Sequence, residues 1–255
     1  MSEKTPAIST KNLEIAYGDF VIQRDLNFTV NRGEIFVLMG GSGCGKTTVM
    51  RCLTGLKAPE KGQVFLGNIS LWEAEQATRD QMAHNIGIVY QSGALWSSMT
   101  LAENVGLPLG EFYDLAPQEI RELSSLKLAL VGLSGFEDYY PSEISGGMRK
   151  RAGVARALAL DPQFLFFDEP SAGLDPVTSS LLDDLILELR DSLGTTMVLV
   201  THELPSIFSV ADNCVYLDGD THTMIAGGDP KRLKTDCEDP KVHAFLTRGG
   251  KNRTG

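Results

Sequence analysis

The chain has 255 residues, of which 42% are hydrophobic and 22% charged, the balance of a globular protein with one large α/β domain or two lobes. The formal net charge of −10 disfavours a nucleic-acid partner, because a nucleic-acid-binding surface needs a basic field. No run approaches the roughly 20 apolar residues that span a bilayer, and the N-terminus lacks a signal pattern, so we expect a cytoplasmic chain.

The N-terminal part predicts two half-buried antiparallel strands. Apolar residues alternate across residues 13–17 and again across residues 26–30, with a turn signal between the two runs. The continuous apolar run 34–39 comes next and is typical of a fully buried strand.

Residues 40–48 read GGSGCGKTT and lie between this strand and a helix-forming run. They fit the pattern G-x-x-x-x-G-K-[ST] in the context that the pattern requires, which predicts a phosphate-binding loop. Glycines let the backbone fold around an anion, so that successive N–H groups and the positive end of the next helix point at it. Lys46 is expected to reach the β- and γ-phosphates, and Thr47 to give its hydroxyl to Mg²⁺. A plain glycine-rich turn, the alternative, needs no Lys-Thr pair at this offset.

The four cysteines are scattered without a C-x-x-C pair, so the sequence indicates neither a disulfide framework nor a zinc site. Buried or reduced thiols are expected. Cys44 is the expected exception, because an N–H-rich loop at a helix N-terminus favours the thiolate.

Two further strands are predicted in the first half of the chain. Residues 55–59 and 61–62 carry turn signals, and residues 63–67 follow as a short strand. Residues 86–90 are another apolar run, which predicts a buried strand that stops at Gln91.

Residues 101–133 predict a separate helical lobe, since Leu and Ala recur at helical spacing without a strand pattern. The helical pattern is interrupted at Pro108, Pro117 and Gly132.

Strand patterns return in the last third of the chain. The runs 164–167 and 197–201 predict strands, and apolar residues at 3.6-residue spacing across 181–189 predict an amphipathic helix between them. Strand, helix and strand in this order give a parallel sheet.

The C-terminal part predicts short elements only. Residues 214–217 and 224–226 are expected to be edge strands, and residues 239–246 a short amphipathic helix. The residues from 249 onward are expected to form a frayed tail.

A carboxylate pair ends the strand at residues 164–167. Asp168 comes directly after this strand, which delivers its carboxylate to the sheet edge where a neighbouring phosphate loop would place Mg²⁺. Glu169 is then positioned to orient or deprotonate an attacking water. Alone, such a pair is more often an ordinary strand-ending turn, and the phosphate loop favours the functional interpretation.

A second anion site is predicted at Ser145, which precedes two glycines and a strongly helical run. A serine N-cap followed by Gly146 and Gly147 offers free N–H groups at the positive end of a helix. A plain cap is the alternative for a lone instance, and a second anion site is unexpected if one loop already binds the phosphates.

Together these motifs resemble the nucleotide-binding subunits of ATP-binding cassette (ABC) transporters over nearly the whole chain. Six elements follow the order of that family: residues 40–48 resemble the Walker A loop, Gln91 the Q-loop glutamine, residues 144–148 the signature, residues 164–169 the Walker B strand with its catalytic glutamate, residues 171–175 the D-loop, and His202 the switch histidine. Met148 departs from the glutamine usual at this position, which leaves its role open.

The resemblance implies an α/β fold of the P-loop NTPase (RecA-like) type, with a parallel-sheet core, an antiparallel β subdomain and an inserted α-helical subdomain. It implies a single ATPase domain over residues 1–255. The catalytic core lobe would comprise residues 1–91 and 160–238, the helical signature lobe residues 92–159, and the C-terminal helix and tail residues 239–255.

The resemblance also implies Mg²⁺-dependent ATP hydrolysis in a head-to-tail homodimer that sandwiches two ATP molecules. Ser145 and Gly147 of one subunit would close on the γ-phosphate that the other holds, Tyr17 would stack on adenine, and His202 would sense the γ-phosphate. The residues implied in catalysis are Lys46, Glu169 and His202. Those implied to hold Mg²⁺ are Thr47, Gln91 and Asp168. Those implied to bind ATP are Tyr17, Gly40, Gly41, Ser42, Gly43, Cys44, Gly45, Lys46, Thr47, Thr48, Gln91, Ser145, Gly146, Gly147 and Asp175.

Four further runs, at residues 148–157, 201–208, 226–230 and 239–246, resemble the ATPases that work with MCE-domain proteins, the Mla-type phospholipid transport systems of bacterial envelopes. This resemblance implies two copies at the cytoplasmic face of the bacterial inner membrane. Each would lie beneath an integral membrane permease subunit, with an MCE-domain lipid-binding protein on the far side.

Two other functions remain open. An ABC importer for amino acids or another small solute would share every catalytic element. A soluble cassette ATPase acting on ribosomes or DNA is disfavoured by the acidic charge and by the lack of a tandem cassette or long coiled coil.

The loop of residues 91–99 also has two interpretations. Its apolar side chains, at Leu95, Trp96 and Met99, either belong to the core or line a groove that takes a short cytoplasmic helix from the permease.

Overall fold

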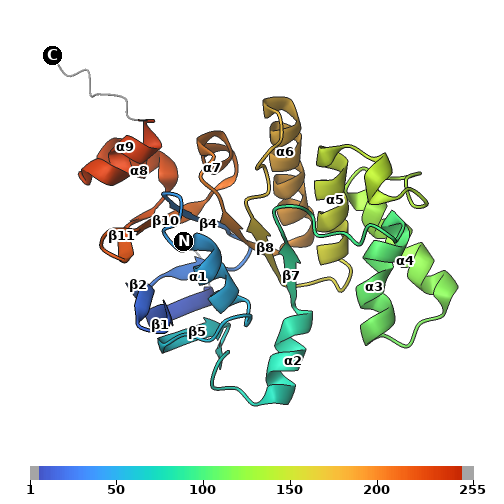
Figure 1. The fold of residues 1–255 in the computed structure, drawn as a ribbon, viewed down its shortest axis with the longest axis horizontal. Coiled ribbons are helices and arrows are strands. Elements are labelled where there is room, and N and C mark those ends of the chain that lie inside the picture. Colours follow the sequence, from blue (N-terminus) through green and yellow to red (C-terminus); the bar gives the residue numbers. More distant parts are fainter. Residues whose placement is uncertain (1–5, 249–255) are drawn as a thin grey trace.

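The computed structural model describes residues 6–248, and within them a six-stranded sheet runs in the order β11-β10-β4-β9-β8-β7 (Figure 1). The strands from β10 to β7 are parallel, and β11 pairs with β10 in the antiparallel sense. Their bounds are β4 (Ile35–Gly40), β7 (Ile86–Val89), β8 (Phe164–Asp168), β9 (Thr196–Val200), β10 (Asn213–Asp218) and β11 (Thr223–Gly228).

A smaller antiparallel sheet orders its strands β2-β1-β5-β6, with β3 also paired to β1. Its strands are β1 (Pro6–Tyr17), β2 (Phe20–Leu26), β3 (Thr29–Asn31), β5 (Lys61–Leu66) and β6 (Ile69–Ser70).

The single strand predicted at residues 26–30 is wrong, because β1 pairs with two separate strands there. Leu26 lies opposite Leu13, whereas Val30 lies opposite Ile8. The turn predicted at residues 61–62 is also wrong, since these residues begin β5. A Cβ on Gly62 would lie 2.2 Å from the carbonyl oxygen of Asn12, so glycine permits the close approach of the two strands.

The helical character predicted for residues 101–133 is confirmed. The chain passes through α3, however, without the predicted break at Pro108. A Thr100–Glu103 capping box begins this helix, and its buried face packs into the core, which together outweigh the hydrogen bond that proline removes.

The helices are α1 (Lys46–Leu53), α2 (Gln76–His84), α3 (Leu101–Phe112), α4 (Pro117–Leu130), the 3₁₀ turn η1 (Pro141–Glu143), α5 (Gly146–Ala157), α6 (Pro176–Leu193), α7 (Leu204–Val210), α8 (Pro230–Asp236) and α9 (Pro240–Leu246).

The six-stranded sheet is buried on both faces, as its continuous apolar strands require. In β4 the side chains of Ile35 and Val37 join a cluster with α3, α5, α6 and α7, whereas those of Phe36 and Leu38 join a cluster with α1 and the antiparallel sheet. Each fully buried side chain of this size stabilises the fold by about 1.5 to 3 kcal/mol. The carboxyl end of β4 is therefore held firmly between two layers (Figure 1).

The position of one strand and the buried face of one helix differ from the sequence predictions. β10 is not an edge strand, because it lies between β4 and β11. The buried face of α6 is formed by Leu182, Ile186 and Leu189. Leu181 lies outside this face and is 62% exposed.

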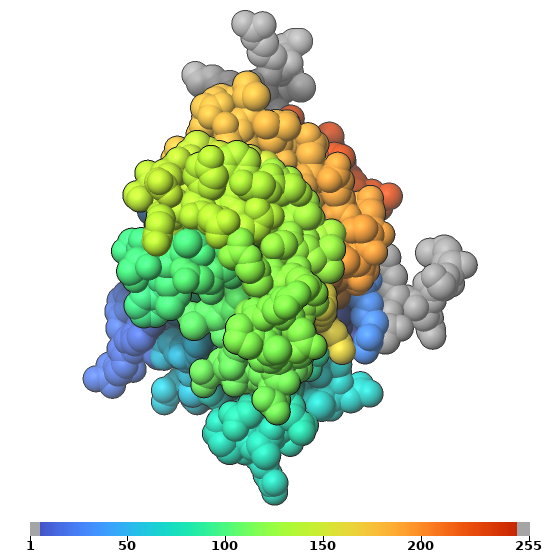
Figure 2. Space-filling model, turned by 90° about the vertical axis from the view of Figure 1, so that its right-hand side faces the viewer, coloured from blue at the N-terminus to red at the C-terminus, as the bar shows by residue number. Residues whose placement is uncertain are grey.

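The α/β fold with a parallel core is confirmed. Helices α3, α4 and α5 pack on one another and form the end of the molecule seen in Figure 2. We propose that they make up the helical lobe of residues 92–159, and that residues 1–91 and 160–238 form the catalytic lobe. Within residues 6–248, no helix combines the length and apolarity that a membrane crossing requires. The tail predicted from residue 249 lies outside the described residues.

A buried carboxyl group in α6 gives the fold a pH dependence. Burial raises the pKa of Asp183 to about 6. The folded state then binds this proton more tightly than the unfolded state, so stability falls as the pH rises from about 4 to 6 and stays low above. Asp183→Asn should therefore raise the free energy of unfolding at pH 7.5 by on the order of 2 kcal/mol.

Denaturant unfolding of Asp183→Asn at pH 4.5 and pH 7.5 measures this effect. Glu188 of the same helix, which is exposed, provides the control: Glu188→Gln should change stability by less than about 0.5 kcal/mol at either pH. An equal effect of Asp183→Asn at both pH values would contradict the prediction.

Candidate functional site

The loop of residues 40–48 joins the end of β4 to the start of α1. Gly40 has a φ of 149° and Gly45 a φ of 97°. A Cβ on Gly40 would lie 2.3 Å from the carbonyl oxygen of Leu217, and one on Gly45 would lie 2.4 Å from Cγ2 of Ile22. Neither position has room for a side chain, so the bare loop backbone lies close against β10 and β2.

Lys46 is the first residue of α1 and folds its side chain back over the loop. Its Nζ donates hydrogen bonds to the carbonyl oxygens of Gly40 at 3.0 Å and Gly41 at 2.9 Å. Among the described residues no carboxylate pairs with this buried ammonium. Its charge therefore adds to the positive end of α1 and remains available to an anion.

Thr47 and Asp168 are in contact, although one strand of the sheet lies between the two strands that position them. The hydroxyl of Thr47 donates to Oδ1 of Asp168 at 2.8 Å, and both residues are half-buried. Asp168 ends β8, and β9 separates that strand from β4. The parallel sheet thus brings a hydroxyl and a carboxylate together at its carboxyl edge. The sequence placed the phosphate loop on the strand next to Asp168, whereas β9 lies between the two strands.

Glu169 has one engaged and one free carboxylate oxygen. Its Oε1 lies 2.9 Å from Nδ1 of His202, whereas no described residue hydrogen-bonds to its buried Oε2. The backbone of Glu169 is left-handed, with a φ of 48°, and its N–H donates to the carbonyl oxygen of Val200 at 2.8 Å. Such a strained conformation persists only where surrounding contacts hold it.

Lys46, Thr47, Glu169 and His202 line a cleft of about 530 Å³. Phe245 of α9 also lines this cleft, and its ring packs edge-on against Tyr216 with 5.3 Å between the ring centres. The sequence placed Phe245 on a helix face but gave it no part in the site. The lining residues are Gly40, Gly41, Ser42, Gly43, Gly45, Lys46, Thr47, Thr48, Glu169, His202 and Phe245.

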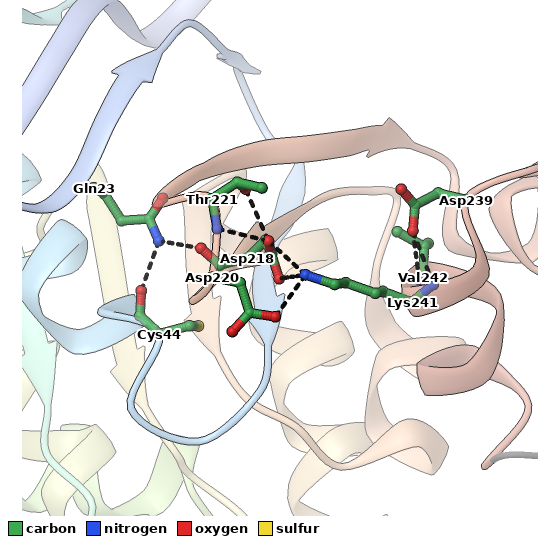
Figure 3. Close-up of polar contacts among 8 residues, drawn as sticks. All are labelled: Gln23, Cys44, Asp218, Asp220, Thr221, Asp239, Lys241 and Val242. Atoms are coloured by element: carbon green, nitrogen blue, oxygen red, sulfur yellow. Dashed lines mark hydrogen bonds and ion pairs between the residues drawn. The ribbon is translucent and has the colours of Figure 1, made fainter.

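A buried glutamine ties the loop to the sheets behind it. Gln23 of β2 donates from Nε2 to the carbonyl oxygen of Cys44 at 2.8 Å and to that of Asp218 at 3.0 Å (Figure 3). The second contact joins residues 195 positions apart, so no local sequence signal indicated it.

An ion-pair cluster holds α9 next to the hydrogen bonds that Gln23 makes. Nζ of Lys241 in α9 lies 2.9 Å from both carboxylate oxygens of Asp218 and 2.7 Å from Oδ2 of Asp220 (Figure 3). Hydrogen bonding to Lys241 and then to Thr221 holds the pKa of Asp218 well below its usual range. Phe245, which is on the same helix as Lys241, is thereby kept at the cleft.

The expectation of a thiolate at Cys44 is wrong. Burial raises the pKa of this thiol, although the nearby charge of Lys46 counteracts the effect. The residue is only 4% exposed, because its side chain packs in the cluster beneath the loop rather than facing the cleft.

Ser145 is the N-cap of α5, as predicted, but it lies outside the cleft. Ser145 caps α5 by accepting a hydrogen bond from the N–H of Met148 at 3.2 Å, and it is exposed. A Cβ on Gly147 would lie 2.4 Å from Cγ2 of Thr178, so α5 packs tightly on α6 there. The side chain of Met148 packs against the core. Residues 145–147 are not among the described residues that line the cleft.

Four other predicted site residues also lie outside the cleft lining, one of them Asp168, whose carboxylate accepts the hydrogen bond from Thr47. Tyr17 is 52% exposed at the end of β1, with Nζ of Lys57 at 4.3 Å from its ring centre. Gln91 is exposed just beyond β7. Asp175 caps α6 by accepting hydrogen bonds from the N–H groups of residues 177 and 178, both at 3.0 Å.

Comparison with known proteins gives concordant results. The family model described as ABC transporter matches residues 23–172. The chain is 36% identical to the intermembrane phospholipid transport system ATP-binding protein MlaF of Haemophilus influenzae, over 94% of the chain and 89% of that protein. It is 38% identical to the Mycobacterium tuberculosis protein described as probable ribonucleotide transport ATP-binding protein mkl, over 94% of the chain and 66% of that longer protein. The chain thus spans slightly less than two thirds of the mycobacterial relative.

Solved structures agree with the fold. The post-hydrolysis dimer of the ATP-binding cassette MJ0796, bound to ADP and Pi, superposes with a TM-score of 0.78 and 28% identity. The superposition covers 87% of this chain and 98% of that one.

The contribution of the Gln23 hydrogen bonds can be tested by replacing the side chain that donates them. Gln23→Leu leaves the carbonyl oxygens of Cys44 and Asp218 buried without a partner, which should lower the free energy of unfolding by about 1 to 3 kcal/mol. Nucleotide affinity should also fall, because the loop loses its anchor. Thermal unfolding and calorimetric titration with a non-hydrolysable ATP analogue measure the two effects.

Gln63 provides the control, since its side chain is paired with Glu73 in an exposed contact. Gln63→Leu should change stability by less than about 0.5 kcal/mol and leave nucleotide affinity unchanged. Wild-type stability and affinity in Gln23→Leu would show that the loop does not depend on this tie.

Proposed function

The chain belongs to the ABC transporter family and is an ATPase of that family, and from this premise we propose that it energises phospholipid transport across the bacterial envelope. The observation that carries the proposal is the 36% identity to MlaF over 94% of the chain and 89% of that relative. The proposed setting is the cytoplasmic face of the inner membrane. The proposed partners there are an integral membrane permease and an MCE-domain lipid-binding protein.

The donor set around the loop fits Mg²⁺ together with the phosphates of ATP. The hydroxyl of Thr47 and the carboxylate of Asp168 are oxygen ligands of the kind that Mg²⁺ prefers, and they already lie within 2.8 Å of each other. Gln91 is the proposed third protein ligand. A bound Mg²⁺ would offset the negative charge of the phosphate oxygens.

Glu169 is the proposed general base for hydrolysis. Its buried Oε2, to which no described residue hydrogen-bonds, can accept a proton from a water molecule. The oxygen of that water then bonds to the γ-phosphorus, while the bond from this phosphorus to the leaving ADP oxygen breaks. His202 holds the other carboxylate oxygen in place, and Lys46 stabilises charge on the phosphate oxygens.

A second copy of the chain is proposed to complete each cleft. Ser145, Gly146 and Gly147 offer an anion site that does not line the cleft of their own chain. A head-to-tail homodimer would place this site over the γ-phosphate held by its partner, with two ATP molecules enclosed. The MJ0796 cassette, solved as a dimer, supports this arrangement. Tyr17 is proposed to stack on adenine with the ring face that Lys57 leaves free, and Asp175 to lie at the junction.

The loop of residues 91–99 is the proposed contact with the permease. Leu95 packs against the core, which fits the first interpretation, whereas the 58% exposure of Trp96 supports the proposed contact. Asn104, which is fully buried, donates to the carbonyl oxygen of Trp96 at 3.0 Å and accepts from its N–H at 2.7 Å. The loop is therefore held in a fixed conformation that presents the indole.

An apolar groove adjoins this loop. Its volume is about 260 Å³, and its lining includes Pro108 and Phe112 of α3 and Arg156 of α5. Arg156 donates to the carbonyl oxygen of Ala94 at 2.6 Å, which joins the groove to the loop. A short amphipathic helix from a permease fits a surface of this kind.

The two relatives suggest different cargoes. The Haemophilus influenzae protein is described as part of a phospholipid transport system, and the mycobacterial protein as a probable ribonucleotide transport protein. The chain matches 89% of the phospholipid relative but 66% of the ribonucleotide relative, which favours phospholipid. An importer for amino acids or another solute remains the alternative.

One purification tests both docking and cargo. The tagged wild-type chain, purified from its native membrane in mild detergent, should retain a permease and an MCE-domain protein, with phospholipid found by mass spectrometry. Trp96→Glu should lose the permease but still bind ATP, since a buried tryptophan commonly contributes on the order of 2 kcal/mol or more at an interface.

Leu126 of α4 provides the control because it is 56% exposed and lies outside the loop, so Leu126→Glu should keep the permease. Unchanged assembly of Trp96→Glu would remove the docking proposal. A complex that carries a nucleotide or amino-acid ligand without phospholipid would replace the proposed cargo.

A further inference from the structure

The side chain of Lys150 leaves α5 and ends beneath the loop that follows β8. Its Nζ donates hydrogen bonds to the carbonyl oxygens of Pro170 at 2.6 Å and Ala172 at 2.7 Å, and it lies 3.5 Å from that of Glu169. The residue is only 8% exposed. One ammonium group therefore binds three carbonyls within four consecutive residues.

Like Lys46 of the phosphate loop, Lys150 is buried, and within residues 6–248 no carboxylate forms an ion pair with it. Lys127 of α4 differs, since it is 5% exposed and its Nζ pairs with the carboxylate of Asp161. Burial lowers the pKa of Lys150, although the charge of Glu169 counteracts the effect. A buried charge is costly unless its hydrogen bonds are satisfied, and here backbone carbonyls alone satisfy them.

The loop that Lys150 binds contains the proposed general base. Glu169 has a left-handed backbone with a φ of 48°, and its N–H is fixed to the carbonyl oxygen of Val200. The hydrogen bonds to Lys150 fix the other side of the same loop. Since the direction of the Glu169 side chain follows from this backbone, the ammonium helps to set where Oε2 points.

The helix that carries Lys150 begins at the second anion site. Ser145 caps α5, and Lys150 lies five residues further on, about 7.5 Å along the axis of a rigid helix. A shift of the helix start would therefore move Nζ and, through it, the loop of residues 169–172.

We propose that Lys150 is a positioning residue that couples the anion-binding start of α5 to Glu169 of the same chain. The inference rests on the proposed role of Glu169 as general base. In addition to binding the γ-phosphate held by the partner subunit, α5 would then position Glu169 of its own chain. The contact between the start of α5 and that phosphate would be transmitted to Glu169 through Lys150.

The test compares ATP hydrolysis by intact transporter complexes that carry Lys150→Met, Lys150→Arg or Lys127→Met. Lys150→Met should lower kcat by about tenfold or more, because displacement of a catalytic group by as little as 1 Å can cost about 100-fold. KM for ATP should change less than about threefold, since the contacts of the phosphate loop remain. Lys150→Arg should recover a large part of kcat, because its guanidinium can donate to the same carbonyls.

Lys127→Met is the matched control for loss of a buried lysine, and it should keep both kcat and KM near their wild-type values. Thermal unfolding shows which variants are folded, and Lys150→Gln replaces Lys150→Met, with the same expectation, if the latter is unfolded at the assay temperature. A wild-type kcat in Lys150→Met, or in Lys150→Gln where it replaces that variant, would overturn the inference, and so would an equal loss of kcat in Lys127→Met.

Glu169→Gln, assayed in parallel, distinguishes failure of the proposed general base from failure of the coupling through Lys150. Activity retained in Glu169→Gln would refute the role of the base itself. Activity lost in Glu169→Gln but retained in Lys150→Met would refute only the coupling.

Discussion

The close approach of the phosphate loop to the strands behind it is the constraint on which the site depends. Gly40 and Gly45 have no room for a Cβ, and Gln23 donates to the backbone on either side of the same contact. The loop is thus held from behind, with its N–H groups arranged before any anion arrives. Such preorganised dipoles cost no reorganisation when negative charge binds or develops. Lys46 and Thr47 take their positions from this loop.

The parallel order of the sheet explains which groups meet. β4, β9 and β8 are neighbours, so the loop, His202 and the pair Asp168–Glu169 all emerge at one edge. Ser145 follows no strand of this sheet and begins a helix of the helical end instead. Each chain therefore carries a cleft and, outside its lining, the start of α5, which we propose as an anion site. The proposed head-to-tail dimer would use both sites twice, and within each chain Lys150 would link the proposed anion site to Glu169.

The fold and the centre of the site were predictable from the sequence because their signals are local. Apolar runs gave the strands, and the contiguous loop motif gave Lys46 and Thr47. The errors arose where packing overrides a local preference: α3 continues through Pro108, and burial opposes ionisation of Cys44. Gln23 and Lys150 were not found, because their partners are far along the chain and are backbone carbonyls, which leave no mark on residue type.

The measurement that most directly tests the composite site mixes two inactive variants in the assembled transporter. Lys46→Ala removes the loop cation of one chain, and Ser145→Arg blocks the anion site of the other. In a head-to-tail dimer a mixed pair places both changes in one cleft and leaves the second cleft intact. The account predicts that the mixture hydrolyses ATP although neither variant does so alone. Activity of the mixture no greater than the average of the two separate variants would contradict it.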